Sequence, residues 1–190
     1  MREINDLLSK QSFTENFLST KKIPETDWVL RTKDSYGPIK IGKKLWIQPS
    51  WNKEKTPKGR IKVLLNPGSS FGTGRHPTTR LMLLAIEDFL LKSEANYFLD
   101  VGSGSGILTA VSLKLGAKKG IGFDIDPQAV ENTRKLLCLN KLSKRSKVIC
   151  GTLEKKYLHS LTGKIDLIVA NIFLDPLQKL FPLFGEILNL

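Results

Sequence analysis

The sequence lacks the features that would mark several classes of protein. No apolar run approaches the roughly 20 residues of a membrane-spanning helix, because Asp, Lys or Gly interrupts each candidate. The opening residues, MREINDLLSKQS, carry charges of both signs and no apolar segment of a secretory signal. Cys138 and Cys150 have neither CxxC nor metal-ligand spacing, and no other metal-ligand cluster is visible. We therefore expect a cytoplasmic protein without a metal or membrane segment, with buried or incidental thiols.

Acidic residues are scarce relative to basic ones. There are 18 Asp and Glu against 30 Lys and Arg, which gives a net charge of +12. Such an excess suits phosphate-rich or acidic partners, and an RNA-associated target would fit it. The lysines, however, are spread in short clusters such as Lys43–Lys44 and Lys118–Lys119, without aromatic residues between them. This distribution is typical of a solvated surface, so we expect no direct nucleic-acid binding.

Strand and helix patterns follow one another along the chain. A short helix is expected around Ile4–Leu8. Two strands joined by a Gly-Lys turn are expected in PIKIGKKLWIQPSW. A charged loop over residues 52–60 and a strand in IKVLL follow. A helix with Pro77 in its first turn follows in the stretch up to FLLK. Next come strand YFLDV, helix ILTAVSLKLG, strand GIGFDI, helix PQAVENTRKLLCLN, strand KVICG, a polar connection, strand IDLIVANI and a helix from about Asp175.

Strands that alternate with helices imply right-handed crossovers and a parallel sheet covered on both faces. The 190 residues, 41% of them hydrophobic and without internal repeats, are enough for a domain with a real core. We therefore predict an α/β fold with a Rossmann-like, doubly wound and mostly parallel sheet. Residues 1–60 are assigned to an N-terminal extension with linker strands, and residues 61–190 to the ligand-binding domain.

The segment FLDVGSGSG is the most informative part of the sequence. Gly102, Gly104 and Gly106 stand at every second position after a predicted strand, where bare backbone can approach a nucleotide-like ligand at a helix start. A dinucleotide fingerprint counted from Gly102 would need glycine where Ile107 stands, which argues against a nicotinamide dehydrogenase. An acid, here Asp100, followed by GxGxG is similar to the motif of S-adenosylmethionine-dependent methyltransferases.

Two acids follow the second strand of this series, in GFDIDPQAV. Asp124 lies 22 residues after Gly102, where a carboxylate can accept both hydroxyls of a ribose. Asp126 competes for this role, but Pro127 follows it, and Asp-Pro suits a helix N-cap and first helical residue. We assign Asp126 to capping and Asp124 to the ligand.

Asn171, in VANIFLDPL after the fourth strand, stands at the position where the methyl acceptor would lie, and it is the candidate residue there. Its amide can both donate and accept hydrogen bonds, although a local Asx-turn is an alternative role. Many methyltransferases that act on planar nitrogens carry Asn/Asp-Pro-Pro-Tyr at this point. The Asn-Ile-Phe-Leu of this chain leaves room for an aliphatic amine instead.

The stretch NPGSSFGTGRHPTT, ahead of the glycine motif, looks like a loop folded over a ligand. Phe71 and the helix start after it suggest a fixed loop rather than a linker. Thr78 or Thr79 could donate hydrogen bonds to a ligand carboxylate. We assign no catalytic role to Arg75 or His76.

Taken together, PGSSFGTGRHPTT, DVGSGSGILT, GFDIDPQAV and VANIFLDPL resemble, in order, the motifs of the PrmA family of ribosomal protein L11 methyltransferases. The resemblance covers roughly residues 28–190. It implies a class I S-adenosylmethionine-dependent fold and methylation of lysine or N-terminal amines of that large-subunit protein. It also implies cofactor contacts from Thr79 at the amino-acid end, from the backbone at Gly102 in the turn with Gly104, from Asp124 at the ribose, and from Asn171 beside the methyl group and acceptor.

The chain departs from the family at both ends. The family has a small substrate-binding domain where residues 1–27 stand, and further strands beyond the position of Leu190. We therefore expect a chain truncated at both ends, with C-terminal strands missing. The sheet edge that these strands would cover is expected to be prone to self-association. The sequence does not determine the oligomeric state. A related methyltransferase acting on RNA or a small molecule and a non-catalytic cofactor-binding remnant are the alternatives.

Overall fold

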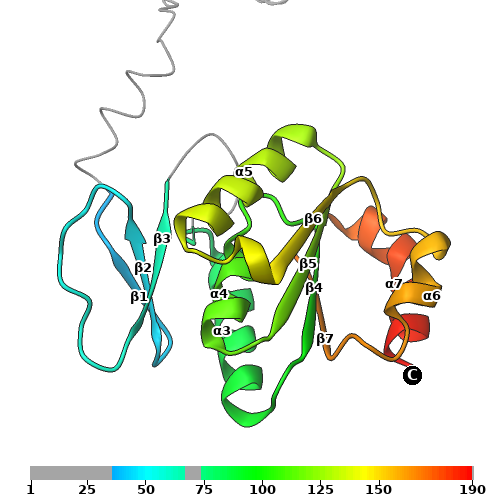
Figure 1. The fold of residues 1–190 in the computed structure, drawn as a ribbon, viewed down its shortest axis with the longest axis horizontal. Helices are drawn as coiled ribbons and strands as arrows, with labels where there is room; N and C mark the ends of the chain where they lie inside the picture. Colours follow the sequence, from blue (N-terminus) through cyan, green and yellow to red (C-terminus); the bar gives the residue numbers. More distant parts are fainter. Residues whose placement is uncertain (1–35, 67–73, 190) are drawn as a thin grey trace, which may run out of the picture. The chain divides into compact units, whose positions relative to one another are not determined.

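Figure 1 shows the arrangement of helices and strands in a computed structural model of the chain, which describes residues 36–66 and 74–189. Tyr36–Leu190 forms one compact unit. The short helix predicted around residues 4–8 lies outside the described residues, as does most of the predicted ligand loop, including position 71.

A four-stranded parallel sheet forms the centre of this unit. Its strand order is β6-β5-β4-β7, and every neighbouring pair is parallel, as the alternation of strands and helices predicted. The strands are β4 (Tyr97–Val101), β5 (Lys119–Asp124), β6 (Ser146–Cys150) and β7 (Leu167–Ala170).

Helices cover both faces of the parallel sheet (Figure 1). One face carries α3 (Pro77–Lys92), α4 (Ile107–Leu115) and α5 (Pro127–Leu139); the other carries α6 (Leu158–Leu161) and α7 (Leu174–Leu188). Side chains of a strand point alternately to the two faces of its sheet. In β4, Phe98 therefore packs toward α3, α4 and α5, whereas Leu99 and Val101 pack toward α6 and α7. The doubly wound prediction is confirmed.

The segment predicted as a polar connection contains α6 and the 3-10 turn η3 (Lys155–Tyr157), and a second such turn, η2 (Ser143–Arg145), precedes β6. These elements are too short to show a helical period in the sequence.

A second, three-stranded sheet lies on the outer side of α3, α4 and α5 (Figure 1). Its order is β1 (Ile39–Ile41), β2 (Leu45–Pro49) and β3 (Ile61–Leu65), with β1 antiparallel and β3 parallel to β2. Apolar side chains of all three strands enter the core that α3, α4 and α5 also line. The domain boundary at residue 60 stays a prediction; β3, just beyond it, is paired with β2.

A buried acid fixes the turn of this small sheet to α3. Glu87, 4% exposed, accepts hydrogen bonds from the N–H groups of Lys43 at 2.8 Å and Lys44 at 2.6 Å. Gly42 adopts a φ of 53°, and a Cβ there would overlap the Glu87 carboxylate. The predicted Gly-Lys turn therefore joins the two layers as well as reversing the chain.

Asn140, at the end of α5, ties the other side of the small sheet to the helices. Its Oδ1 accepts from the Leu64 N–H at 2.9 Å, and its Nδ2 donates to the carbonyls of Leu64 at 2.7 Å and Leu136 at 2.9 Å. The side chain thus acts as an additional strand partner for β3.

We expect Asn140→Ala to lower the free energy of unfolding by about 2–4 kcal/mol, because it leaves the N–H and C=O of Leu64 without a partner. Urea denaturation measures this loss. Asn132→Ala serves as the control, since Asn132 accepts only one exposed bond from Gln128 and should change stability by no more than about 0.5 kcal/mol. Equal losses in the two variants would contradict the strand-partner role.

Candidate cofactor site

The register of the parallel sheet brings the candidate residues into one row. Val101, the last residue of β4, lies opposite Phe123 of β5 and Ala170 of β7. The residues that follow these three are Gly102, Asp124 and Asn171, respectively. Three positions chosen separately in the sequence therefore meet at the carboxyl edge of the sheet, which is where open α/β sheets bind ligands.

The glycine turn has a backbone that other residues adopt at a cost. Gly102, Gly104 and Gly106 have φ values of 78°, 54° and 80°, all in the left-handed region. The N–H groups of Gly102 and Ser103 both donate to the carbonyl of Phe123, at 2.8 and 2.9 Å, so the turn is held against the end of β5.

Thr133 of α5 fixes the turn from the helix side. Its hydroxyl donates to the Gly104 carbonyl at 3.0 Å and contacts the Ser103 hydroxyl at 3.2 Å. The sequence analysis did not single out this residue. A signal was present, because Thr133 is the one polar member of the buried stripe that α5 otherwise builds from Ala129, Val130, Leu136 and Leu137.

Asp124 is held in a fixed orientation at the end of β5. Its Oδ2 accepts from the Gly104 N–H at 2.8 Å, and its Oδ1 accepts from the Asp126 N–H at 3.0 Å. Each carboxylate oxygen has a further lone pair, so two hydroxyls can still be accepted. Asp126 caps α5 by accepting from the Gln128 N–H at 2.9 Å, and Pro127 is the first helical residue, which confirms the predicted capping role.

Thr79 and Asn171 meet across the sheet edge. Thr79 lies in the first turn of α3 and is 1% exposed; the Asn171 Nδ2 donates to its hydroxyl at 3.4 Å. The other candidates nearby have local partners. The Thr78 hydroxyl is 2.8 Å from the Nδ1 of His76, which caps α3, and Arg75 lies 4.5 Å from the Tyr36 ring centroid.

Ile172 is a second residue that the sequence analysis missed. A Cβ built on Gly102 would lie 2.2 Å from Cγ2 of Ile172, so this side chain lies directly against the glycine backbone. Nothing in the sequence marks Ile172, because the contact joins loops that follow two different strands.

Asp100 places a buried carboxylate beneath the glycine turn. It is fully buried, and its Oδ2 accepts from the Thr109 N–H at 3.2 Å and hydroxyl at 2.7 Å, while its Oδ1 has no partner among the described residues. Burial raises the pKa of Asp100 from 3.8 to about 6; the Thr109 hydrogen bonds act in the opposite direction, and the charge of Asp124 adds to the rise.

We expect the buried Asp100 carboxyl to make stability depend on pH. Because its pKa is raised in the folded state, its contribution is complete below the unfolded pKa near 4 and is lost as pH rises through about 6. The shift corresponds to about 3 kcal/mol. Asp100→Asn should remove this component, which urea denaturation at pH 4 and pH 7.5 would measure. An unchanged difference between the two pH values would contradict the assignment.

Other predictions concern the rest of the described chain. Cys138 and Cys150 were expected to be buried or incidental thiols; both are free and exposed, which excludes the first of these two descriptions. Within residues 36–66 and 74–189, no group of three His, Cys, Asp or Glu side chains is placed to hold a metal ion. No helix among these residues is long and apolar enough to cross a membrane.

A parallel sheet of this order, with a glycine turn after its central strand and an acid at the end of the next, defines a class I S-adenosylmethionine-dependent methyltransferase fold. The family model described as "Ribosomal protein L11 methyltransferase (PrmA)" matches residues 1–189. The chain belongs to this family.

Relatives of known name agree with the family. The ribosomal protein L11 methyltransferase of Haemophilus influenzae (strain PittEE) is 36% identical over 191 residues, which cover 100% of this chain and 62% of the relative. That of Shewanella sp. (strain ANA-3) is 41% identical over 166 residues, or 87% and 54% of the two chains. A crystal structure of ribosomal protein L11 methylase from Lactobacillus delbrueckii subsp. bulgaricus has a TM-score of 0.67 and 34% identity, covering 81% of this chain and 76% of that one. The chain thus spans 62% or less of the length of these two curated relatives.

Proposed function

We propose that this chain binds S-adenosylmethionine and takes part in methyl transfer to lysine or N-terminal amines of ribosomal protein L11. The observation that carries the proposal is the single row formed by Gly102, Asp124 and Asn171, with Thr79 bonded to the last of them. The names of the relatives supply the protein substrate. A cytoplasmic location, where ribosomal proteins are made, belongs to the same proposal.

The residues of the row fit the parts of this cofactor. Asp124 accepts the ribose hydroxyls, and the left-handed backbone of Gly102 and Gly104 forms the turn beside it, with the Gly104 N–H bonded to Asp124. Thr79 meets the carboxylate of its amino-acid end, because the first turn of α3 has hydroxyl and N–H donors there. When bound, S-adenosylmethionine supplies an electrophilic methyl group on a sulfonium.

Asn171 orients the acceptor amine. Its Nδ2 is directed to Thr79, which leaves Oδ1 to accept an N–H of the incoming amine. That amine must be neutral to react, although the pKa of lysine in water is about 10.4. Burial in the site lowers this pKa, and the site acts by proximity, orientation and removal of water rather than through a dedicated base.

Calorimetric titration of the chain with S-adenosylmethionine and, separately, with NAD tests the cofactor. We expect saturable binding of S-adenosylmethionine and no binding of NAD. Binding of NAD alone would overturn the proposal. Absence of binding with both ligands would indicate a remnant that has lost the cofactor pocket. Incubation with labelled cofactor and either ribosomal protein L11 or ribosomal RNA then identifies the acceptor. Label in RNA rather than protein would contradict the amine assignment.

A further inference from the structure

Four cations from separate segments gather at one place on the surface. They are Lys62 of β3, Lys114 of α4, Lys141 just after α5, and Arg145 of η2, and we call them the basic cluster. The charges of Lys62, Lys141 and Arg145 all act on Lys114. α4 and α5 both begin near the glycine turn, and the cluster lies at their other ends, about 13 Å away along the nine residues of α4.

Hydrogen bonds to the backbone hold the cluster together. Arg145 Nη2 donates to the carbonyls of Leu113 and Ala117, the latter at 3.1 Å, so its guanidinium is fixed beside Lys114. The Asn140 side chain, bonded to both backbone groups of Leu64, brings Lys141 next to the strand that carries Lys62. The arrangement follows from the packing of β3, α4 and α5 on one another.

No acid of the described residues forms an ion pair with these cations. The ion pairs of the described residues involve Lys92, Lys135 and Lys156, and none involves the basic cluster. The sequence contains no Asp or Glu over residues 55–64, 112–123 or 138–149, the segments that supply the four cations. Partial burial, followed by the charges of Arg145, Lys62 and Lys141, lowers the pKa of Lys114. A bound anion would relieve this repulsion.

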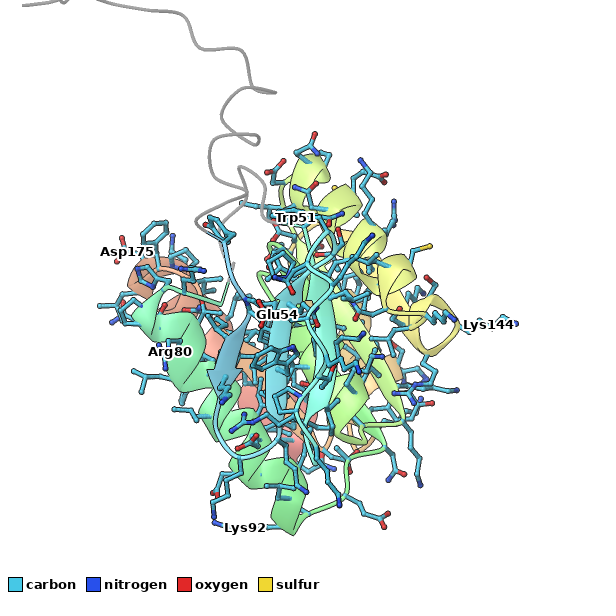
Figure 2. The ribbon with its side chains drawn as sticks, turned by 90° about the vertical axis from the view of Figure 1, so that its left-hand side faces the viewer. Trp51, Glu54, Arg80, Lys92, Lys144 and Asp175 are labelled. Atoms are coloured by element: carbon cyan, nitrogen blue, oxygen red, sulfur yellow. The ribbon has the colours of Figure 1, made fainter. Side chains whose placement is uncertain are left out.

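One further cation adjoins the basic cluster in the sequence. Lys144 precedes Arg145 in η2, and Figure 2 shows Lys144 extending outward from the molecule. The sequence analysis interpreted the lysines as scattered. They are scattered along the chain, but the fold brings the four members of the basic cluster together from three acid-free segments.

We propose that the basic cluster binds the phosphate backbone of RNA. The large exposed apolar side chains of the described residues lie on α3, after β5, and on or just before α7, and none lies in the cluster. A protein partner would ordinarily need such anchors, whereas phosphates are bound by charge alone. The choice of RNA as the polyanion rests on the proposed function, because the proposed substrate is a ribosomal protein.

The binding of a short fluorescent RNA duplex, measured by anisotropy at several salt concentrations, tests the inference. The double variant Lys62→Gln/Lys141→Gln should weaken binding at least about tenfold near 0.1 M salt and lower the salt slope by about 2. The control Lys92→Gln/Lys135→Gln loses the same net charge from exposed, ion-paired sites and should stay within about twofold of the unmodified chain.

Several results would overturn the inference. An equal loss in the control would show diffuse attraction by net charge, and the absence of salt-dependent RNA binding would show no site. Equal affinity for a polyglutamate peptide would indicate an acidic protein partner, and tighter binding of DNA would reject RNA. Titration of the same variant with S-adenosylmethionine separates the two proposals, because the cluster lies away from the row of Gly102, Asp124 and Asn171. If the unmodified chain bound RNA but not S-adenosylmethionine, the proposed function would fail and the RNA site would stand.

Discussion

Asp124→Ala is expected to reduce the affinity for S-adenosylmethionine at least about 100-fold, because it removes the acceptor of two ribose hydroxyls, each bond to a charged group being worth about 1.5–3 kcal/mol. The change also frees the N–H groups of Gly104 and Asp126, which water can reach in part. We therefore expect a folded protein whose unfolding free energy falls by only about 1–2 kcal/mol. Calorimetric titration and urea denaturation measure the two quantities separately.

Asp126→Ala is the matched control, since Asp126 is the other acid of the same loop. It caps α5 through Gln128 and has no assigned ligand. Its loss should lower stability by about 1 kcal/mol and leave cofactor affinity unchanged. Wild-type affinity in Asp124→Ala, or equal loss of affinity in both variants, would reject the ribose assignment.

Gly106→Ala is expected to have the largest effect on folding. With φ at 80°, alanine in this conformation costs about 1–2 kcal/mol. Its Cβ would also lie 2.9 Å from Thr133 Cα and 2.8 Å from Thr133 Cγ2, and the backbone of α5 cannot give way as a flexible side chain would. Overpacking of this kind adds about 1–3 kcal/mol. The sum is a large part of the stability of an ordinary domain.

Gly59→Ala separates the two contributions. Gly59 has a φ of 79°, almost that of Gly106, but a Cβ there meets no atom within 4 Å. It should show the conformational cost alone. If urea denaturation gave the same loss for both variants, close packing of α5 on the glycine turn would not be the reason for glycine at position 106.

The sequence predicted those parts of the fold that depend on neighbouring residues. The strand and helix periods, Pro77 at the start of α3 and the Asp-Pro start of α5 are all signals within one or two turns of chain. The row of Gly102, Asp124 and Asn171 could also be anticipated, because residues that end adjacent parallel strands meet at one edge.

The contacts that the sequence did not predict join residues far apart. Thr133 reaches the glycine turn across 29 positions, and Asn140 reaches Leu64 across 76. A periodic pattern shows which residues are buried but not which polar partner each will meet. The basic cluster could not be predicted from the sequence either, because its members come from segments that are far apart in the chain.

The alignment of the site with the sheet register has a consequence for how this chain can vary. The loops at the opposite edge of the sheet can change in length without moving Gly102, Asp124 or Asn171 relative to one another. One residue inserted within β5 or β7 would instead displace its terminal residue from the row by one position, about 3.3 Å, and turn the following side chains to the other face. Insertions should therefore accumulate between the helices and the strand starts, and stay absent from the strands themselves.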